Sequence, residues 1–351
     1  MRTSHPSGDR PAARDRSRPP DATRGARRPL RTESPDPVTR TRAGAGLLAA
    51  VGGLLLAGAL QAETWRFAAI GDTPYSSHEL RELPRMLDDI AAEHAAFVVH
   101  AGDFKDSRSV CSDGLFEARR DLLDASPVPL IYVPGDNEWT DCRHLPAGEF
   151  DPLERLQKLR QLFFAAPRSL GQSTLPLERQ PGDYPEHLRW RLGPVLFVSL
   201  NVPGPNNNFG LGKEPRDEFV SRNAAVIDWL RQAFAVARRE QLAGLVIIMQ
   251  GNPAFRHHAA GLPHAGYREL LRTLSDETVA FPGRVLLIHG DSHWQRIDQP
   301  LRHPATKRPI TNFTRLETFG YPFMGWVKII IDDEGPQLFR FEIHPHPRRL
   351  P

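Results

Sequence analysis

The stretch Phe97–Asp106, FVVHAGDFKD, is a run of apolar residues that ends in Gly-Asp. Three other apolar runs end in the same dipeptide: FAAIGD at Asp72, LIYVPGD at Asp136 and VLLIHGD at Asp291. Short apolar runs bounded by glycine are typical of buried strands, and glycine permits a tight turn where a strand ends. Because ligands of open α/β sheets gather at the carboxyl ends of the strands, the motifs predict one edge that carries four carboxylates.

The alternative interpretation of a Gly-Asp pair is an ordinary turn. Gly8-Asp9 and Gly182-Asp183 follow no apolar run, and we interpret both as turns. The last strand motif continues as Asp291-Ser292-His293, which adds an imidazole to the carboxylates. Carboxylate oxygens and an imidazole nitrogen suit hard or borderline divalent metal ions, so the motifs together predict a metal site.

Apolar spacing between the motifs predicts alternating strands and helices, a pattern typical of α/β proteins with parallel strands. In the first half of the body we expect strands over 65–70, 96–101 and 129–133, and helices over 79–96, 115–123 and 153–164. In the second half we expect a hairpin of strands 188–192 and 195–200, helices over 217–240 and 267–274, and strands over 245–249 and 285–288. The tail predicts a further hairpin of 326–332 with 337–343.

Both halves of the body contribute Gly-Asp strands to the same predicted edge. This favours a single domain over residues 63–351 that contains two sheets. His100 and His289 lie within apolar runs, and we expect both to be core residues rather than ligands.

The first 43 residues differ from the body in composition and charge. They contain eleven arginines, no lysine and five acidic residues, a net charge of +6, which leaves −3 for the rest of the chain. A segment with so few large apolar side chains cannot bury enough surface to fold, so residues 1–43 are predicted to be a disordered Arg/Pro-rich extension. Because the body is slightly acidic, we expect no nucleic-acid partner.

Residues 44–62 predict a signal peptide for export. Two arginines precede the apolar stretch Gly44–Leu60, and small residues at its end offer cleavage after Ala59 or Ala62. A membrane anchor is the alternative, but the stretch is short and rich in glycine and alanine for a span. We therefore expect a periplasmic or secreted protein without a stable membrane span after cleavage. A translation start at Val38 would give the signal a leader of ordinary length, which N-terminal sequencing of the precursor would test.

The chain has two cysteines, Cys111 and Cys142, and each follows a Gly-Asp motif by a few residues. Two thiols in an exported protein usually pair, and their spacing is not that of a zinc site. The sequence therefore predicts a disulfide bond between loops at the same edge of the sheet.

These residues resemble the motif series of the calcineurin-like metallophosphoesterases, which runs D-x-H, G-D-x-x-D, G-N-H-[DE], a later His, and G-H-x-H. The resemblance spans about Phe67 to His293. It implies an α/β fold, a four-layer α/β/β/α sandwich of two mixed sheets, with the terminal β region completing the second sheet. It also implies a dinuclear metal centre that hydrolyses a phosphoester.

The resemblance implies six metal ligands: Asp72, Asp103, Asp136, Gln250, Asp291 and His293. Asp103 matches the carboxylate that bridges both metals. Asp136 stands where the family has an asparagine, and Asp291 stands where it has a histidine. A second histidine is missing before Pro253, with Gln250 or Asn252 as the side chains that could replace it, so oxygen ligands replace nitrogen ones at the histidine positions. Such a set shifts the expected preference toward Mn²⁺, Mg²⁺ or Ca²⁺, with Fe or Zn as alternatives.

Three further residues match catalytic positions in the resemblance. Asn137 stands where the family has the histidine that stabilises phosphate, Glu138 is the supporting acid beside it, and Asp106 closes the G-D-x-x-D motif. Pro74 replaces the histidine of D-x-H, and Asn137 donates hydrogen bonds but carries no positive charge. These changes keep an alternative open, namely a non-catalytic metal- or phosphate-binding protein on the same fold.

The expected substrate is a small phosphorylated molecule. Arg256 and His257 follow the strand that ends at Gln250 and are candidates to bind phosphate, because a guanidinium grips phosphate with two hydrogen bonds. Asn201, which lies at the end of an apolar run before the polar loop 202–212, is the third candidate for substrate binding.

Overall fold

The computed structural model describes residues 64–346, apart from 211, 213, 263, 264 and 304. The predicted extension over 1–43 and the predicted signal peptide over 44–62 lie outside the described residues. Among the helices of the described part, none has both the length and the hydropathy of a membrane span.

The first sheet contains five strands in the order β12-β11-β1-β2-β3. Their bounds are β1 Thr64–Ile70, β2 Val98–His100, β3 Leu130–Tyr132, β11 Gly325–Asp332 and β12 Phe339–Pro345. The strands β1, β2 and β3 are parallel, whereas β11 runs antiparallel to β1, and β12 antiparallel to β11. Because parallel strands end at the same edge, the aspartates that follow β1, β2 and β3 share one edge of this sheet.

The second sheet contains seven strands in the order β4-β5-β6-β7-β8-β10-β9. Their bounds are β4 Glu178–Arg179, β5 Leu188–Leu192, β6 Val195–Ser199, β7 Gly244–Ile248, β8 Arg284–His289, β9 Arg296–Asp298 and β10 Phe313–Glu317. The strands β6, β7, β8 and β10 are parallel, and β4, β5 and β9 join through antiparallel pairs. Both sheets are therefore mixed, which confirms the predicted fold class of an α/β protein with two mixed sheets.

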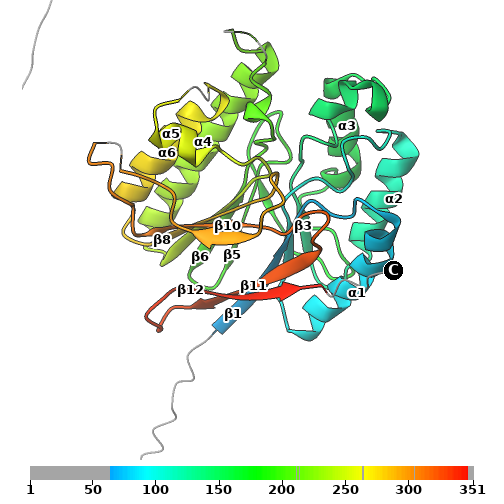
Figure 1. The fold of residues 1–351 in the computed structure, drawn as a ribbon. Coiled ribbons are helices and arrows are strands. Elements are labelled where there is room, and N and C mark those ends of the chain that lie inside the picture. The colour runs from blue at the N-terminus through cyan, green and yellow to red at the C-terminus, as the bar shows by residue number, and fades with distance from the viewer. Residues whose placement is uncertain (1–63, 211, 213, 263–264, 304, 347–351) are drawn as a thin grey trace, which may run out of the picture. The chain divides into compact units, whose positions relative to one another are not determined.

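Helices cover the sheets from two sides. Figure 1 shows α1, α2 and α3 on one side and α4, α5 and α6 on the other. Their bounds are α1 Ser77–Ala92, α2 Asp113–Asp124, α3 Pro152–Phe163, α4 Asp217–Arg239, α5 Phe255–Ala259 and α6 Ala265–Ala280, with short 3₁₀ turns η1 Thr140–Arg143, η2 Leu145–Ala147 and η3 Asn206–Asn208. Side chains fix the starts of three of them: Ser76, Ser112 and Asp151 accept backbone N–H groups in the first turns of α1, α2 and α3.

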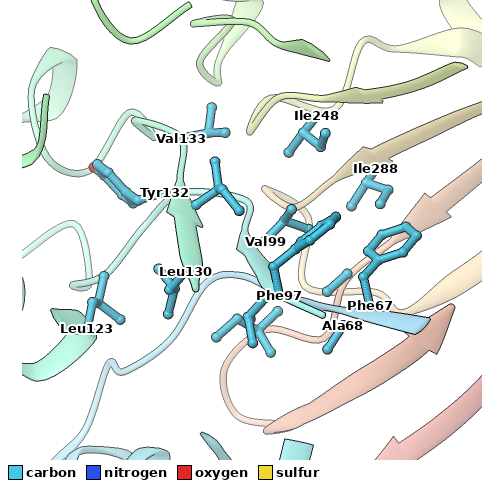
Figure 2. Close-up of a cluster of buried hydrophobic side chains, with 14 of the residues drawn as sticks. Phe67, Ala68, Phe97, Val99, Leu123, Leu130, Tyr132, Val133, Ile248 and Ile288 are labelled. Carbon is cyan, nitrogen blue, oxygen red and sulfur yellow. The ribbon is translucent and has the colours of Figure 1, made fainter. Parts of the chain in front are cut away.

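Two apolar cores hold these elements together. In the first, Phe67 of β1 meets Phe197 of β6 edge to face with ring centroids 5.0 Å apart, so the two sheets contact each other directly. Figure 2 shows Phe67 and Phe97 in the same cluster as Ile248 and Ile288, which come from the second sheet. The second core lies between the second sheet and the helices α4 and α6. Burial of these large side chains is the main stabilising contribution.

The predicted elements are confirmed apart from their ends. The helix expected over 267–274 extends over Ala265–Ala280, and both predicted hairpins form. The expectation that the tail completes the second sheet is wrong in part. The strands β9 and β10 extend the second sheet, but β11 and β12 join the first sheet beside β1. That pairing joins Phe67 to Ile329, and no local sequence pattern specifies so distant a partner.

The predicted disulfide is confirmed. Cys111 and Cys142 are bonded, with their Cα atoms 5.7 Å apart, and both are completely buried. The bond links the loop after β2 to the turn η1, which follows β3. His100 and His289 are also completely buried, as expected of core residues, and each has a ring nitrogen 2.8 Å from a backbone carbonyl oxygen.

Candidate functional site

The aspartates of all four Gly-Asp motifs lie just past the ends of parallel strands. Asp72, Asp103 and Asp136 follow β1, β2 and β3 and are buried, and Asp291 follows β8 of the second sheet. Asp72, Asp103 and Asp291 have positive φ angles of 51°, 60° and 78°. A left-handed backbone is uncommon for residues other than glycine and concentrates at functional sites.

The glycine before each of two aspartates makes room for a neighbouring carboxylate. A Cβ atom on Gly135 would lie 2.0 Å from Asp103 Oδ1, and one on Gly290 would lie 2.2 Å from Asp72 Oδ2. Any other residue at either position would displace the carboxylate. In these two motifs the aspartate lies at the end of its own strand, and the glycine leaves space for the aspartate that follows another strand.

One group of site residues consists of Asp72, Asp291 and His293. The backbone N–H of Asp291 donates to both carboxylate oxygens of Asp72 at 3.0 and 3.2 Å. His293 Nδ1 lies 2.7 Å from the carbonyl oxygen of Tyr321, and Nε2 lies 3.5 Å from Asp72 Oδ1. Because a carbonyl only accepts, Nδ1 carries the proton, and Nε2 faces the carboxylate. A metal-binding histidine is commonly held in this way, with its second nitrogen donating to a carbonyl.

A second group consists of Asp103, Asp136 and Gln250. The amide nitrogen of Gln250, just past β7, donates to Asp103 Oδ2 at 3.1 Å and to Asp136 Oδ1 at 2.7 Å. Its amide oxygen accepts the backbone N–H of Gly204 at 2.6 Å. Gln250 thus presents a donor to the carboxylates, and its oxygen reaches them only if the amide turns over.

Tyr75 completes the second group, although no motif in the sequence points to it. Its hydroxyl donates to Asp103 Oδ2 at 3.1 Å and accepts from Asn137 Nδ2 at 2.8 Å. The carboxylate of Glu79, buried at the start of α1, accepts the backbone N–H of Tyr75 at 2.6 Å and so fixes its position. The Ser76-x-x-Glu79 pattern is typical of a helix start, but no sequence signal indicates that the preceding tyrosine reaches Asp103.

Glu138 lies behind Asp103 rather than in the open pocket. Its Oε1 accepts the backbone N–H of Phe104 at 3.1 Å and the Tyr132 hydroxyl at 2.8 Å, and the residue is completely buried. Asp106 instead forms a turn, because its carboxylate accepts the backbone N–H groups of Arg108 and Ser109. Burial opposes ionisation of Asp106, but hydrogen bonds from the Ser109 hydroxyl and from these two N–H groups lower its pKa.

Burial and mutual repulsion raise the pKa values of the site carboxylates. Burial raises the pKa of Asp103 well above its usual value, and the charge of Asp136 adds to this effect. Burial also raises the pKa of Asp136 well above its usual value, and there the charge of Asp291 is the next cause. The pKa of Asp291 is raised to about 7, chiefly by burial and further by Asp72. The carboxylates therefore concentrate negative charge where little water solvates it. A bound cation would neutralise this charge.

Asp291 lines more than one pocket formed by the described residues. The aspartate pocket, of about 370 Å³, is lined by Tyr75, Asp103, Asp106, Ser107, Arg108, Asp136, Asn137, Asp141, Asp291 and His293. Arg256 and His257 line a neighbouring pocket of about 990 Å³ that also contains Asp291. Asn201 is completely buried, and its amide donates to Glu186 at 3.0 Å, so it lies apart from the residues that line these pockets.

The chemistry of this residue set fits divalent cations. Within the described part of the chain, no three histidine, cysteine, aspartate or glutamate side chains are arranged as a ready metal-binding group. Nevertheless, carboxylates with raised pKa values and the Nε2 atom of His293 lie around one pocket. Carboxylate and imidazole donors of this kind are typical ligands of Mn²⁺, Mg²⁺, Fe and Zn.

Several solved structures resemble this chain at low sequence identity, whereas none of the curated proteins matches its sequence. A dimetal phosphatase from Danio rerio is 13% identical, with a TM-score of 0.47 over 80% of this chain and 96% of its own. A purple acid phosphatase from yellow lupin (Lupinus luteus) seeds is 13% identical, with a TM-score of 0.48 over 77% of this chain and 50% of its own. A PhoD structure is 11% identical, with a TM-score of 0.47 over 80% of this chain and 68% of its own.

The family match covers most of the chain. The family model of calcineurin-like phosphoesterases matches residues 66–295, a span that contains all four Gly-Asp motifs and His293. Members of this family use divalent metal ions, typically two. The chain belongs to the calcineurin-like phosphoesterase family.

Proposed function

We propose that the protein is an exported, metal-dependent phosphoester hydrolase with a dinuclear metal centre. The observation that carries this proposal is the convergence of Asp103, Asp136, Asp291 and His293 on one pocket in a chain of the phosphoesterase family. Asp72 lies within ion-pair distance of His293 and belongs to the same cluster.

The ligands divide into two sets in this proposal. Asp72 and His293 hold one metal ion, Asp136 and Asp291 hold the other, and Asp103 bridges both. The surroundings of Gly204 support the second pair: a Cβ atom there would lie 2.3 Å from Asp291 Oδ1 and 3.2 Å from Asp136 Oδ1, so the two carboxylates lie close together. Gln250 joins as a ligand if its amide turns over to present its oxygen. Two metal ions bound by these residues would supply charge that polarises the phosphoester and lowers the pKa of a water molecule.

The chain's own side chains bind and orient the phosphate. Asn137 Nδ2 is a donor at the pocket wall, held by the Tyr75 hydroxyl 2.8 Å away. Burial, followed by the charge of Asp103, raises the pKa of Tyr75 well above its usual value, so the phenol stays protonated and remains a donor. Glu138 is a positioning residue. It accepts hydrogen bonds from Phe104, which follows Asp103, and from Tyr132 of β3, the strand that precedes Asp136. Arg256 and His257 are proposed to contact the substrate outside the aspartate pocket.

The proposal of export has two supports. Residues 44–62 have the pattern of a signal peptide. The Cys111–Cys142 disulfide is the second support, because structural disulfides persist mainly in oxidising compartments such as the periplasm or the extracellular space. Mass spectrometry of the mature protein would test export, and an intact N-terminus upstream of Gly44 would contradict it.

A non-catalytic metal- or phosphate-binding protein on this fold is the second candidate. The hydrogen bonds of the Gln250 amide nitrogen to Asp103 and Asp136, where the family has a histidine, favour it. Asn137 favours it as well, since an amide lends neither positive charge nor a proton to a leaving group.

One experiment separates the two candidates. Protein purified without chelator is analysed for metals and then assayed with Mn²⁺ against a panel of phosphomonoesters and phosphodiesters. A hydrolase binds two metal ions per chain and releases phosphate or an alcohol. The variant Asn137→His restores the imidazole and is expected to raise hydrolysis. If two metal ions bind and neither the parent nor Asn137→His hydrolyses any ester, the protein is a non-catalytic metal- or phosphate-binding protein.

A further inference from the structure

A second pocket adjoins the aspartate pocket and differs from it in charge. We name it the arginine pocket; it has a volume of about 990 Å³, and its walls include Arg256, Trp294, Arg296, Arg302 and Arg315. These residues come from α5, from β9 and β10, and from the segments beside β9. The guanidinium groups favour a positive electrostatic potential in this pocket, whereas the buried carboxylates favour a negative one in the aspartate pocket.

Two of the four arginines are already neutralised. Arg296 Nη2 lies 2.6 Å from Glu317, and Arg315 Nε lies 2.7 Å from Asp298. Both pairs link β9 to β10. Their positive charges are therefore balanced within the protein, and they contribute little attraction for a ligand.

The other two arginines have no such partner. Arg256 and Arg302 are exposed, and within the described part of the chain neither guanidinium forms an ion pair or a side-chain hydrogen bond. His257 stands beside Arg256 in the same wall. Both guanidinium groups are therefore available to a ligand, and a guanidinium is well suited to bind phosphate or carboxylate.

The arginine pocket and the aspartate pocket share one wall residue. Asp291 lines both of them, and Asn252 and Ser292, which contact Asp291 or follow it, line the arginine pocket. A molecule whose phosphoester lies against Asp103 and Asp136 can therefore extend past Asp291 toward the arginines. Trp294, which is 71% exposed, offers an apolar wall along this route.

We infer that the arginine pocket binds a second negatively charged group of the substrate, through Arg256 and Arg302. The substrate class is thus a phosphoester that carries another anion, phosphate or carboxylate, at a distance from the ester that is hydrolysed. This inference rests on the proposed function, because the first anionic group is the ester bound at the aspartates. Trp294 contacts the part of the substrate that joins the two anions.

The test uses phenyl phosphates whose para position carries an alkyl chain of varied length, ended by a methyl, a carboxylate or a phosphate group. Only release of the phenol is followed, and every member has the same phenol leaving group, so differences in kcat/KM report binding of the distal end. We expect the carboxylate or phosphate members of at least one chain length to have a KM about three- to tenfold lower than the methyl member. Comparison of the two anionic ends identifies the preferred anion.

Variants locate the effect. In the double variant Arg256→Gln, Arg302→Gln the ratio of KM for the methyl members to KM for the charged members falls to about one. The control is Arg231→Gln, since Arg231 is an exposed arginine on α4 outside the arginine pocket, and this variant keeps the preference. The preference also falls as salt is raised, as expected for exposed charges. No preference at any chain length, or a preference that survives in the double variant, would overturn the inference.

The inference can fail separately from the proposed function. If the parent hydrolyses no member of the series with any metal, the proposed function fails, and the same compounds are compared by isothermal titration calorimetry. Tighter binding of the charged members that is lost in the double variant supports the arginine pocket as an anion site. Equal binding of charged and methyl members by the parent rules it out.

Discussion

The hydroxyl oxygen of Tyr75 lies 2.8 Å from Asn137 Nδ2, and the same hydroxyl donates to Asp103 Oδ2 at 3.1 Å. One side chain thus connects the residue that stands in place of the family's phosphate-binding histidine to the proposed bridging carboxylate. Edge-on contact with His293, with ring centroids 5.3 Å apart, extends the connection to the other proposed metal ligands. Tyr75 is therefore placed to orient both halves of the site.

The variant Tyr75→Phe keeps the ring and removes both hydrogen bonds. Because the Asn137 amide then loses the partner that orients it, we expect kcat to fall by about tenfold or more while KM changes less. The free energy of unfolding should fall by only about 1 kcal/mol. Steady-state kinetics and thermal melting measure the two effects. Tyr321→Phe, a change on the exposed tyrosine that stacks on Tyr75, is the control and should have normal kcat.

The variant Asp103→Asn should affect metal content more than a change at any other ligand. Asp103 is the proposed ligand of both ions, so its loss weakens two coordination spheres, whereas Asp72→Asn chiefly weakens one. Elemental analysis after gel filtration is expected to find the lowest metal content in Asp103→Asn. Asp88→Asn, on the exposed face of α1, is the matched control. Equal metal content in Asp103→Asn and the parent would remove Asp103 from the proposed bridging position.

Metal ions should also stabilise the fold. The buried carboxylates repel one another when no cation is bound, and metal that binds only the native state adds stability by mass action, about 2.7 kcal/mol at a hundredfold excess over Kd. We expect Tm to rise with Mn²⁺ and to fall with EDTA. In Asp103→Asn the melting temperature should respond less to both. A protein shown to have lost its metals but melting at the same temperature would contradict the shared site.

The Cys111–Cys142 disulfide should contribute measurably to stability. It joins residues 31 positions apart, and closing a loop of this size is worth about 3–4 kcal/mol in the chain-entropy description. The double variant Cys111→Ser, Cys142→Ser should therefore have a lower free energy of unfolding by about that amount. Reduction of the parent with dithiothreitol should give a similar loss, and should leave the melting temperature of the variant unchanged. Mass spectrometry confirms the state of the thiols in each sample.

Acid should destabilise the protein in part through His187. Its Nδ1 lies 2.7 Å from Gln180 Oε1, and burial lowers its pKa to about 4 despite the nearby charge of Glu186. The folded state thus binds a proton less readily than the unfolded state. Neutral His187 therefore makes its full contribution to the free energy of unfolding above about pH 6.5. This contribution falls by up to about 3 kcal/mol as the pH falls toward about 4.

The variant His187→Asn tests this assignment, because asparagine offers a similar donor to Gln180 but has no titrating group. Urea unfolding at a series of pH values should give a shallower decline between about pH 6.5 and 4 than in the parent. His144→Asn, at an exposed histidine, is the control. Parallel pH profiles for the parent and His187→Asn would assign the acid sensitivity to other groups.

The sequence by itself determined the elements whose causes are local. Apolar runs that end in Gly-Asp specify strands that turn tightly, so the order of residues alone is enough to place Asp72, Asp103, Asp136 and Asp291 at strand ends. The helix over Asp217–Arg239 follows from its apolar spacing in the same way. The disulfide was also predictable, because the sequence predicts export and its two cysteines have only each other as partners.

Only the tertiary structure decided which distant residues meet. The pairing of β11 with β1, the contact of Tyr75 with Asn137 across 62 positions, and the hydrogen bonds of the Gln250 amide all join segments with no local relationship. The sequence predicted a ligand oxygen from Gln250, whereas the backbone N–H of Gly204 holds that oxygen and turns the nitrogen to the carboxylates. Strand periodicity and residue type specify where along the backbone a side chain is attached. The direction in which it points inside a pocket depends on all the neighbours that pack against it, and these come from distant segments.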